Sequence, residues 1–305
     1  MFVYTDYEEA KKNAPYCIAL GSFDGVHFGH KKLIDTVLKK SEEFNCNSMI
    51  YTFLEHPKKI LSPDYSPEMI TDNKRRMYLA EKHGLDNLYF EDFKNIKDMD
   101  SNTFIREVLI KIFRIKCAVA GYNFRFGHDR SGDVKMLKTL GEKYGFEICI
   151  IEPVEVRGNA VSSSLIRDMI KDGNVEPVKE YLGRHFSING VVIHGKKNGE
   201  KIGVRTANIS VNPDIVVPKL GVYHTNTIVD GKVYSSITNI GYNPTFNGNK
   251  ISIETHIIAF DGYLYNREIE VEFLKWHREE KPFCSIDELK QQINYDINFR
   301  LLLNM

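Results

Sequence analysis

Five short runs of apolar and β-branched residues recur through the first half of the chain. They begin near Cys17, Ser48, Asn87, Cys117 and Glu147. Their spacing of about thirty residues is the length of a strand, a helix and the connection back to the next strand. Between them, apolar positions recur with helical period, as in residues 33–38 and 104–113. The pattern predicts a doubly wound α/β domain with a parallel sheet, whose ligands bind beyond the carboxyl ends of the strands.

The second half of the chain, from Phe186 onward, has a different pattern. Its short strand-like runs predict a mostly β fold. The turn signals between them include Asp230-Gly231, Asn247-Gly248 and Asp261-Gly262. A regular helix is expected at the end, where Ser285 and Glu288 have the spacing of a capping box. The apolar positions of this helix are Leu289, Ile293, Ile297 and Leu301. We place the domain boundary near Gly183, which gives domains 1–183 and 184–305.

The composition is that of an ordinary soluble globular protein, with 42% hydrophobic and 27% charged residues in a chain of 305. Basic and acidic residues both number 41, so no basic field argues for a nucleic acid partner. No apolar run approaches the roughly 18 residues of a membrane helix, and the first residues do not form a secretory signal. The five cysteines form no C-x-x-C pair and are interpreted as reduced thiols. We expect a cytoplasmic protein that binds no membrane. The sequence is compatible with a homo-oligomer as well as with a monomer.

The most informative segment lies between the first apolar run and the first helix. It contains Gly21, Phe23, Asp24, Gly25, His27, Gly29 and His30. Glycines let the backbone approach a nucleotide, and a helix N-terminus offers amides and a positive dipole end to phosphate. The two histidines, three residues apart, can donate hydrogen bonds to the same phosphate chain. The alternative is a tight turn that carries two incidental surface histidines. The segment is neither a Walker A loop nor a dinucleotide-binding fingerprint.

The β half contains a second group of polar candidates. Thr206 and Asn208 alternate along an extended segment, so their oxygens can face the same way and hold Mg²⁺ beside ATP. An ordinary exposed strand edge explains them equally well. Glu254 lies on the polar face of an alternating strand, residues 251–260, from which it can reach a substrate. Its alternative is a solvated strand carboxylate.

Several segments of the first half carry a resemblance to a known family. Residues 21–30 resemble the G-x-F-D-G-x-H-x-G-H signature of the nucleotidyltransferase superfamily, as found in prokaryotic bifunctional riboflavin kinase/FAD synthetases. Residues 52–57 are similar to its T-F-x-P-H-P, with Glu55 in place of a proline. Residues 121–127 resemble G-x-N/D-F-x-F-G, and residues 162–167 resemble S-S-T-x-I-R, with Ser164 in place of threonine.

The resemblance continues through the second half. Residues 203–208 are similar to the riboflavin kinase motif G-F-P-T-A-N, although Val204 and Arg205 replace its Phe and Pro. Residues 239–246 resemble N-x-G-x-x-P-T-F, and residues 254–256 resemble E-x-H on the strand that follows. The resemblance implies a nucleotidyltransferase-type α/β domain followed by a riboflavin kinase-like β barrel with a C-terminal helix.

For the first domain, the resemblance implies that the phosphate of FMN attacks the α-phosphorus of ATP to form FAD and pyrophosphate. His27 and His30 would be catalytic and stabilise the charge on the leaving group. Ser162, Ser163 and Arg167 would hold phosphates. Asn123 would lie against the flavin or the nucleotide, and a plain turn role is its alternative. Asp24 would lie near the turn and hold it. The residues expected to contact the nucleotide or its phosphates in this segment are Gly21, Phe23, Asp24, Gly25 and Gly29.

For the second domain, the resemblance implies transfer of phosphate from ATP to riboflavin. Gly203, Thr206 and Asn208 would hold ATP, Thr206 and Asn208 would also bind Mg²⁺, and Glu254 would accept the proton of the riboflavin 5′-hydroxyl. Mg²⁺ is thus the expected cofactor, with ATP as co-substrate and no tightly bound organic cofactor. The Val204 and Arg205 substitutions leave open a single-function FAD synthetase with an impaired kinase half, unless Arg205 itself contacts phosphate. A non-catalytic flavin or nucleotide sensor is the other alternative.

Overall fold

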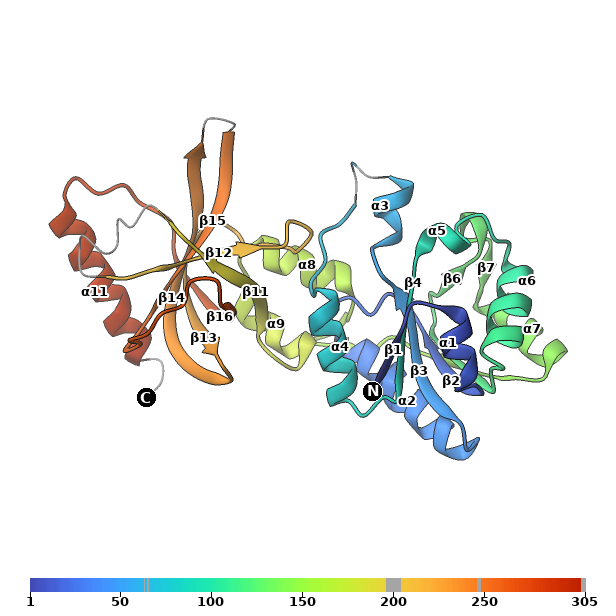
Figure 1. Ribbon diagram of the computed structural model, residues 1–305. Helices are drawn as coiled ribbons and strands as arrows, with labels where there is room; N and C mark the ends of the chain where they lie inside the picture. The colour runs from blue at the N-terminus through green and yellow to red at the C-terminus, as the bar shows by residue number, and fades with distance from the viewer. Residues whose placement is uncertain (63, 65, 196–203, 246–247, 303–305) are drawn as a thin grey trace. The chain divides into compact units, whose positions relative to one another are not determined.

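The computed structural model describes residues 1–62, 64, 66–195, 204–245 and 248–302. Gly203 and Asn247, which belong to two of the sequence predictions, lie outside these described residues. The chain divides into two compact units, Met1–Ser163 and Ser164–Met305. The first unit runs from blue to green and the second from yellow-green to red in Figure 1. The boundary near Gly183, which separates the two expected activities, stays a prediction.

The first unit is built on a parallel sheet of six strands in the order β1-β4-β3-β2-β5-β8. The strands are β1 Phe2–Tyr4, β2 Tyr16–Leu20, β3 Asn47–Phe53, β4 Asn87–Glu91, β5 Cys117–Gly121 and β8 Glu147–Ile151. Five of them begin within one residue of the positions predicted from the sequence. The edge strand β1 was not predicted, because Phe2 and Val3 are exposed and three residues are too short to show a period.

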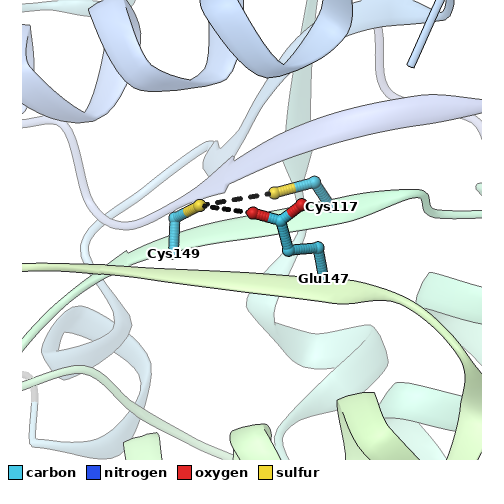
Figure 2. A group of neighbouring side chains, drawn as sticks. All are labelled: Cys117, Glu147 and Cys149. Atoms are coloured by element: carbon cyan, nitrogen blue, oxygen red, sulfur yellow. Dashed lines mark hydrogen bonds between the residues drawn. The ribbon is translucent and has the colours of Figure 1, made fainter. Parts of the chain in front are cut away.

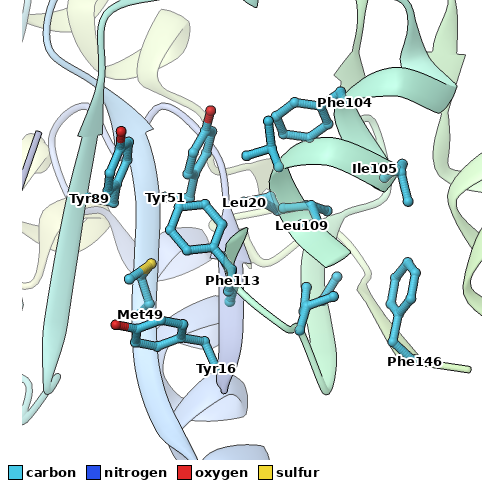
Figure 3. Packing of buried hydrophobic residues seen from close by; sticks show 14 of the residues in the cluster. Tyr16, Leu20, Met49, Tyr51, Tyr89, Phe104, Ile105, Leu109, Phe113 and Phe146 are labelled. Atoms are coloured by element: carbon cyan, nitrogen blue, oxygen red, sulfur yellow. The ribbon is translucent and has the colours of Figure 1, made fainter. Parts of the chain in front are cut away.

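Helices cover both faces of this sheet, which confirms the doubly wound fold. Along β2, Cys17 and Ala19 belong to one core cluster and Ile18 and Leu20 to the other, as the alternation of a strand requires. The first cluster packs under α2 Phe28–Glu43 and α4 Asn73–Lys82. The second packs against α1 Tyr7–Lys12, η2 Phe104–Ile112 and α7 Val134–Tyr144. Figure 3 shows the aromatic rings of the second cluster between the sheet and η2.

The segment 104–113 differs in one respect from its sequence prediction. It forms a π-helix, η2, where an α-helix was expected from the apolar period. Phe104, Ile105, Val108 and Leu109 are nevertheless all buried, so the predicted apolar face is present. Shorter elements complete the unit: α3 Pro57–Leu61, α5 Phe93–Ile96, α6 Ser101–Thr103, β6 Arg125–Phe126, η3 His128–Arg130, β7 Gly132–Asp133, β9 Glu155–Val156 and β10 Asn159–Ala160.

The second unit is a closed antiparallel barrel of six strands, in the order β11-β12-β15-β14-β13-β16, flanked by helices. Its elements are α8 Ser163–Lys171, α9 Val175–Leu182, β11 Phe186–Ile193, β12 Ala207–Val211, β13 Gly221–Val229, β14 Lys232–Thr245, β15 Gly248–Ile257, β16 Glu268–Arg278 and α11 Ile286–Leu302. The barrel and the C-terminal helix confirm the predicted fold class. Asp230 and Gly231 have φ values of 48° and 77° and join β13 to β14 in the predicted tight hairpin. Within the described ranges, none of the helices combines the length and the apolarity needed to span a membrane.

The barrel interior contains a group of buried hydroxyls. Thr225, Thr227, Ser236, Thr238 and Thr255 are all 0% exposed. The Thr225 hydroxyl lies 2.8 Å from that of Ser236 and 2.9 Å from that of Thr238, and Thr238 donates to Thr255 at 2.9 Å. Since each hydroxyl bonds to another one, the group satisfies its own polar atoms without water.

The C-terminal helix begins as the sequence predicts, and its buried residues are charged. The Ser285 hydroxyl accepts the backbone N–H of Glu288 at 3.1 Å, which is the expected cap. The apolar Leu301 is 42% exposed, whereas the buried residues of the helix are Asp296 and Arg300.

These two charged residues are buried because each has partners on the barrel. Asp296 pairs with Arg278 at 2.8 Å, and the Arg300 guanidinium donates to the Thr225 carbonyl at 3.1 Å and to Asn226 Oδ1 at 2.6 Å. A buried charge with several hydrogen bonds is tolerated where an unpaired one is not.

His224 on β13 makes the stability of this unit pH-dependent. The side chain is 0% exposed, and its ring lies 4.4 Å from that of His277 and 5.3 Å from that of Phe299. Burial, followed by electrostatic interaction with His277 and Arg300, lowers its pKa to about 4. In the unfolded chain, His224 takes up a proton as the pH falls below about 6.5, whereas in the folded unit it does so only near pH 4. Stability is therefore lost as the pH falls through this window.

We expect His224 to lower the free energy of unfolding by about 2–3 kcal/mol when the pH is changed from 7 to 4.5. Urea unfolding at the two pH values measures it. His224→Phe, whose ring can still stack on Phe299, should reduce the difference by that amount. His194→Gln, at an exposed histidine, should leave it unchanged, and an equal difference in all three proteins would contradict the assignment.

Candidate active sites

The topology of the first unit brings three of its motif segments to one edge of the sheet. β2 lies between β3 and β5, and all three strands are parallel. One segment, residues 21–30, follows the carboxyl end of β2. The other two, residues 52–57 and 121–127, begin with the last residues of β3 and β5 and continue beyond these strands. This edge is where ligands bind in open α/β sheets.

The turn after β2 has a strained backbone that packing holds in place. Phe23, Gly25 and Val26 have φ values of 49°, 83° and 42°. For a residue with a side chain this conformation costs about 1–3 kcal/mol, and such strain is typical of functional turns. Phe23 is 1% and Val26 4% exposed, and a Cβ at Gly25 would lie 3.1 Å from Ile70 Cδ1. The surrounding core therefore fixes the shape of the turn.

Asp24 anchors this turn from within. Its side chain is 1% exposed, and its Oδ1 accepts the backbone N–H groups of Ile70 at 2.8 Å and Thr71 at 3.1 Å. The backbone N–H of Gly25 donates to the Thr71 hydroxyl at 3.0 Å, and the Ser163 hydroxyl donates to the Asp24 carbonyl at 2.9 Å. These contacts support the predicted holding role of Asp24. Its contact with phosphate stays a prediction.

His27 and His30 form a stacked pair at the start of α2. His27 is the N-cap, and its Nδ1 accepts the backbone N–H of His30 at 3.2 Å, so the ring carries its proton on Nε2 when neutral. The ring centroids are 3.7 Å apart at an angle of 11°. A Cβ at Gly29 would lie 3.0 Å from His27 Cε1, so this glycine allows the ring to fold back. The side chains are 6% and 8% exposed, which excludes the alternative of two incidental surface histidines.

The surroundings of His30 favour its neutral form. Burial, and then the charges of His27 and Arg76, hold its pKa well below the usual value. Its Nδ1 is buried and has no hydrogen-bond partner within the described part of the chain. At neutral pH His30 therefore offers an imidazole hydrogen bond and no charge, and a buried nitrogen without a partner is typical of a site that a ligand completes.

Arg76 on α4 connects this site to the neighbouring turn, and the sequence reasoning missed it. It is 3% exposed and donates to the Ser22 carbonyl and to the Thr52 hydroxyl, each at 3.2 Å, and to the Phe53 carbonyl at 2.9 Å. Burial lowers its pKa to about 10, so it is charged at neutral pH. In the sequence it stands within the run Lys74-Arg75-Arg76, and no local signal distinguishes it from its neighbours.

Replacing Arg76 with methionine should remove these bonds and leave buried oxygens of both turns without donors. We expect the free energy of unfolding to fall by about 3–5 kcal/mol. The activity expected of the first domain should also fall while that expected of the barrel is unchanged. Chemical denaturation and separate product assays measure the two effects. Lys82→Met, at an exposed position on the same helix, is the control, and equal behaviour of the two variants would contradict this role.

The remaining predicted residues of the first site differ in how the structure places them. Asn123 is exposed in the turn after β5, at the same sheet edge as Gly21. A Cβ at Gly21 would lie 3.3 Å from the Phe23 ring, so this glycine gives the turn room. Ser162 and Ser163 lie at the start of α8. Arg167 is buried on α8 within the second unit, and its contact with phosphate stays a prediction.

In the second unit, Thr206, Asn208 and Glu254 come together on the outward face of the barrel. Asn208 pairs directly with Glu254 between β12 and β15. Their strand neighbours Ile209 and Thr255 point into the barrel and are buried. The Thr206 hydroxyl donates to Glu254 Oε2 at 3.5 Å. The predicted polar face is confirmed, whereas the role of each residue stays a prediction.

Two cavities meet at this cluster. One, of about 290 Å³, is lined by Gly195, Thr206, Asn208, His256 and Tyr265 among others. The other, of about 250 Å³, is lined by Thr206, Asn239, Glu254, His256 and, on α11, Leu289 and Ile293. Thr206 and His256 belong to both linings. The two cavities therefore adjoin at Thr206 and His256, with Glu254 in the lining of the smaller one.

The comparisons with known proteins agree for both halves. A FAD synthetase family model matches residues 9–165, and a riboflavin kinase model matches residues 182–301. The bifunctional riboflavin kinase/FMN adenylyltransferase of Bacillus subtilis is 35% identical over 292 residues, which cover 94% of this chain and 92% of that protein. The protein of the same name from Escherichia coli K12 is 34% identical over 282 residues, with coverages of 92% and 90%.

This chain belongs to the bifunctional riboflavin kinase/FMN adenylyltransferase family. A crystal structure from Streptococcus pneumoniae, named a macrolide-efflux protein, has a TM-score of 0.87 and 28% identity and covers 98% of both chains. That likeness supports the fold of the whole chain, and its name supplies no activity here.

The departure from the kinase motif of the family leaves both cavities open. The Arg205 side chain is 78% exposed and lines the larger cavity, with its Nη1 3.7 Å from Asp261 Oδ1. The Arg205 carbonyl accepts a hydrogen bond from His256 Nδ1 at 2.8 Å. Val204 is buried and lines the smaller cavity. The backbone at this point is thus tied to β15 without the proline that is usual in the family.

Proposed function

We propose that this protein phosphorylates riboflavin to FMN on its barrel and adenylylates FMN to FAD at the sheet edge of its first unit. The observation that carries the proposal is the presence, in one chain of this family, of two separate clusters suited to phosphate chemistry. One is the stacked pair His27 and His30 at the start of α2, and the other is Thr206, Asn208 and Glu254 between two cavities.

At the first site, the FMN phosphate attacks the α-phosphorus of ATP and pyrophosphate leaves, with no covalent enzyme intermediate. The N-terminus of α2 and the imidazoles of His27 and His30, of which His30 is neutral, offer N–H groups to the phosphate chain. Their contribution is largest where negative charge builds up on the leaving pyrophosphate. Because the turn is already fixed by Asp24 and Arg76, these groups need little rearrangement when the reaction occurs.

At the second site, we place ATP in the larger cavity and riboflavin in the smaller one, which has α11 as one wall. The riboflavin 5′-oxygen attacks the γ-phosphorus, its proton passes to Glu254, and ADP leaves. Glu254 faces the smaller cavity, where the hydroxyl would be. A Cβ at Gly195 would overlap the Asn208 side chain, so the backbone there comes as close to the ligand-binding residues as glycine allows.

We assign Mg²⁺ to Thr206 and Asn208. Their hydroxyl and amide oxygens, with the Glu254 carboxylate nearby, are the hard donors that this ion prefers. When bound, the ion would neutralise charge on the ATP phosphates. We also propose that the two activities divide near Gly183, that the protein acts in the cytoplasm and that it requires no nucleic acid. Self-association is left for measurement.

The test is to incubate the purified chain with ATP and Mg²⁺, and either riboflavin or FMN, and to separate the flavins by chromatography. Riboflavin should yield FMN and then FAD, and FMN should yield FAD with one pyrophosphate for each FAD. FAD from FMN but no product from riboflavin would identify a single-function FAD synthetase with an impaired kinase half. No product from either flavin would identify a sensor.

A further inference from the structure

Four cysteines gather on one side of the sheet: Cys46 lies just before β3, Cys17 and Cys117 lie near the amino-terminal ends of β2 and β5, and Cys149 lies in the middle of the edge strand β8. Cys17 on β2 lies directly opposite Cys117 on β5. Cys46 Sγ is 3.4 Å from Cys17 Sγ, and Cys117 Sγ is 3.9 Å from Cys149 Sγ on β8. Cys17 and Cys117 belong to the core cluster that packs under α2, and the partly buried Cys46 and Cys149 pack against it. Neither proposed reaction uses them.

A carboxylate completes the group at its outer end. Cys149 donates to Glu147 Oε1 at 3.4 Å, and the ligand atoms of Cys117, Glu147 and Cys149 all lie within 4.8 Å of one another (Figure 2). Lys40 on α2 lies 2.7 Å from Glu147 Oε1. Glu147 is exposed whereas Cys117 is buried, so the group is open to solvent on the glutamate side.

The distances match those of a tetrahedral metal site. With Zn–S bonds of about 2.3 Å and Zn–O bonds of about 2.0 Å, two thiolates would be about 3.8 Å apart, and a thiolate and a carboxylate oxygen about 3.5 Å apart. The observed separations are 3.9 Å for the two sulfurs and 3.4 Å for sulfur and oxygen. Both contacts of Cys149 therefore have the spacing of a tetrahedral site, while the donor atoms of Cys117 and Glu147 lie within 4.8 Å of each other.

The strand register argues against a disulfide between the same two cysteines. Cys117 pairs with Glu147, whereas Cys149 pairs with Val119, so the cysteines are offset by two positions on neighbouring strands. Strand spacing and rise put such Cα atoms about 8 Å apart, beyond the roughly 4.4–6.8 Å that a disulfide spans. A bridging ion tolerates this offset because it lies between the sulfurs.

We propose that Cys117, Cys149 and Glu147 bind a thiophilic divalent cation of the Zn²⁺ class, with solvent as the fourth ligand. Binding would release one proton from each thiol, so two protons leave for each ion bound. The resulting centre has one net negative charge, which the Lys40 ammonium faces through the Glu147 carboxylate. The ion clamps β5 to β8 beneath α2 and stabilises the sheet on which the nucleotide turn is built.

The test uses the full chain, reduced and stripped of metal with a chelator, and titrated with Co²⁺. Thiolate-to-cobalt charge-transfer bands in the near ultraviolet should saturate at one ion per chain, with visible bands of tetrahedral Co²⁺, and Zn²⁺ should displace them. Co²⁺ bound at the histidine pair would lack the thiolate band. Zn²⁺ should also raise the melting temperature of the chain.

Matched variants locate the site. Cys149→Ala should lose the charge-transfer bands, and Lys40→Met should weaken Co²⁺ binding by about 10-fold or more. Cys284→Ala, at an exposed cysteine, should behave as the parent chain does. Cys149 is partly buried and Glu147 is exposed, so Cys149→Ala and Glu147→Gln are expected to fold. Circular dichroism checks the folding of both variants. No thiolate band in the parent chain, or an undiminished band in Cys149→Ala, would overturn the proposal.

Discussion

Replacing His30 with alanine is expected to reduce FMN adenylyl transfer by about 10²–10³-fold while riboflavin phosphorylation continues at the parent rate. The imidazole is 8% exposed, neutral and stacked on His27, so it acts as a fixed N–H donor. Because negative charge on the pyrophosphate is greatest in the transition state, the loss should fall on kcat more than on the KM for ATP. Steady-state assays of FAD and pyrophosphate, with FMN as substrate, measure it.

A second variant separates chemistry from folding at this position. His30→Asn keeps an N–H donor in a smaller side chain and should retain more adenylyl transfer than His30→Ala does. Both variants remove the stacking partner of His27, so a purely structural role would make them equally inactive and equally destabilised. Equal activities in the two variants would therefore count against the donor role.

Replacing Glu254 with glutamine is expected to reduce riboflavin phosphorylation by about 10²–10⁴-fold and to leave FMN adenylyl transfer unchanged. Glutamine has nearly the same shape as glutamate and can still accept the Thr206 hydroxyl bond, but it cannot take up the proton of the attacking hydroxyl. Formation of FMN from riboflavin, followed at saturating ATP, measures the loss.

Glu268→Gln is the matched control, because Glu268 is exposed at the start of β16 in the same unit. It should phosphorylate riboflavin at the parent rate. If Glu254→Gln retained kinase activity close to that of this control, the general base would have to be another group.

Much of the fold could be predicted because local patterns decide it. The runs beginning near Cys17 and Ser48 are buried strands, and no other element suits short β-branched runs spaced by helices. The interior of the barrel could not be predicted. Thr225 and Thr238 look like residues of ordinary exposed strand faces, and only closure of the barrel brings their hydroxyls together. The same holds for Asp296 and Arg300, whose burial depends on partners far away in the sequence.

The candidate sites could also be predicted only where a local pattern marks them. Glycines and histidines next to a helix start are a local signal, so His27 and His30 could be found from the sequence. Their stacking and the lowered pKa of His30 depend on burial, which the sequence does not contain. Arg76 was missed because its bonds to the Ser22 and Phe53 carbonyls cross between strands. The left-handed conformation of Phe23 and Val26 could not be foreseen from these residue types either.

The central claim, that one chain contains two independent phosphate-transfer sites, is tested most directly by mixing two single-site variants. With riboflavin, ATP and Mg²⁺, the His30→Ala chain alone should accumulate FMN and form FAD about 10²–10³-fold more slowly than the parent chain, and the Glu254→Gln chain alone should form FMN about 10²–10⁴-fold more slowly. The mixture should form FAD much faster than either variant alone, because FMN released by the first chain is a substrate for the second. A mixture that forms FAD no faster than the two variants do separately would contradict the account, as would FAD formed from riboflavin at the parent rate by either variant alone.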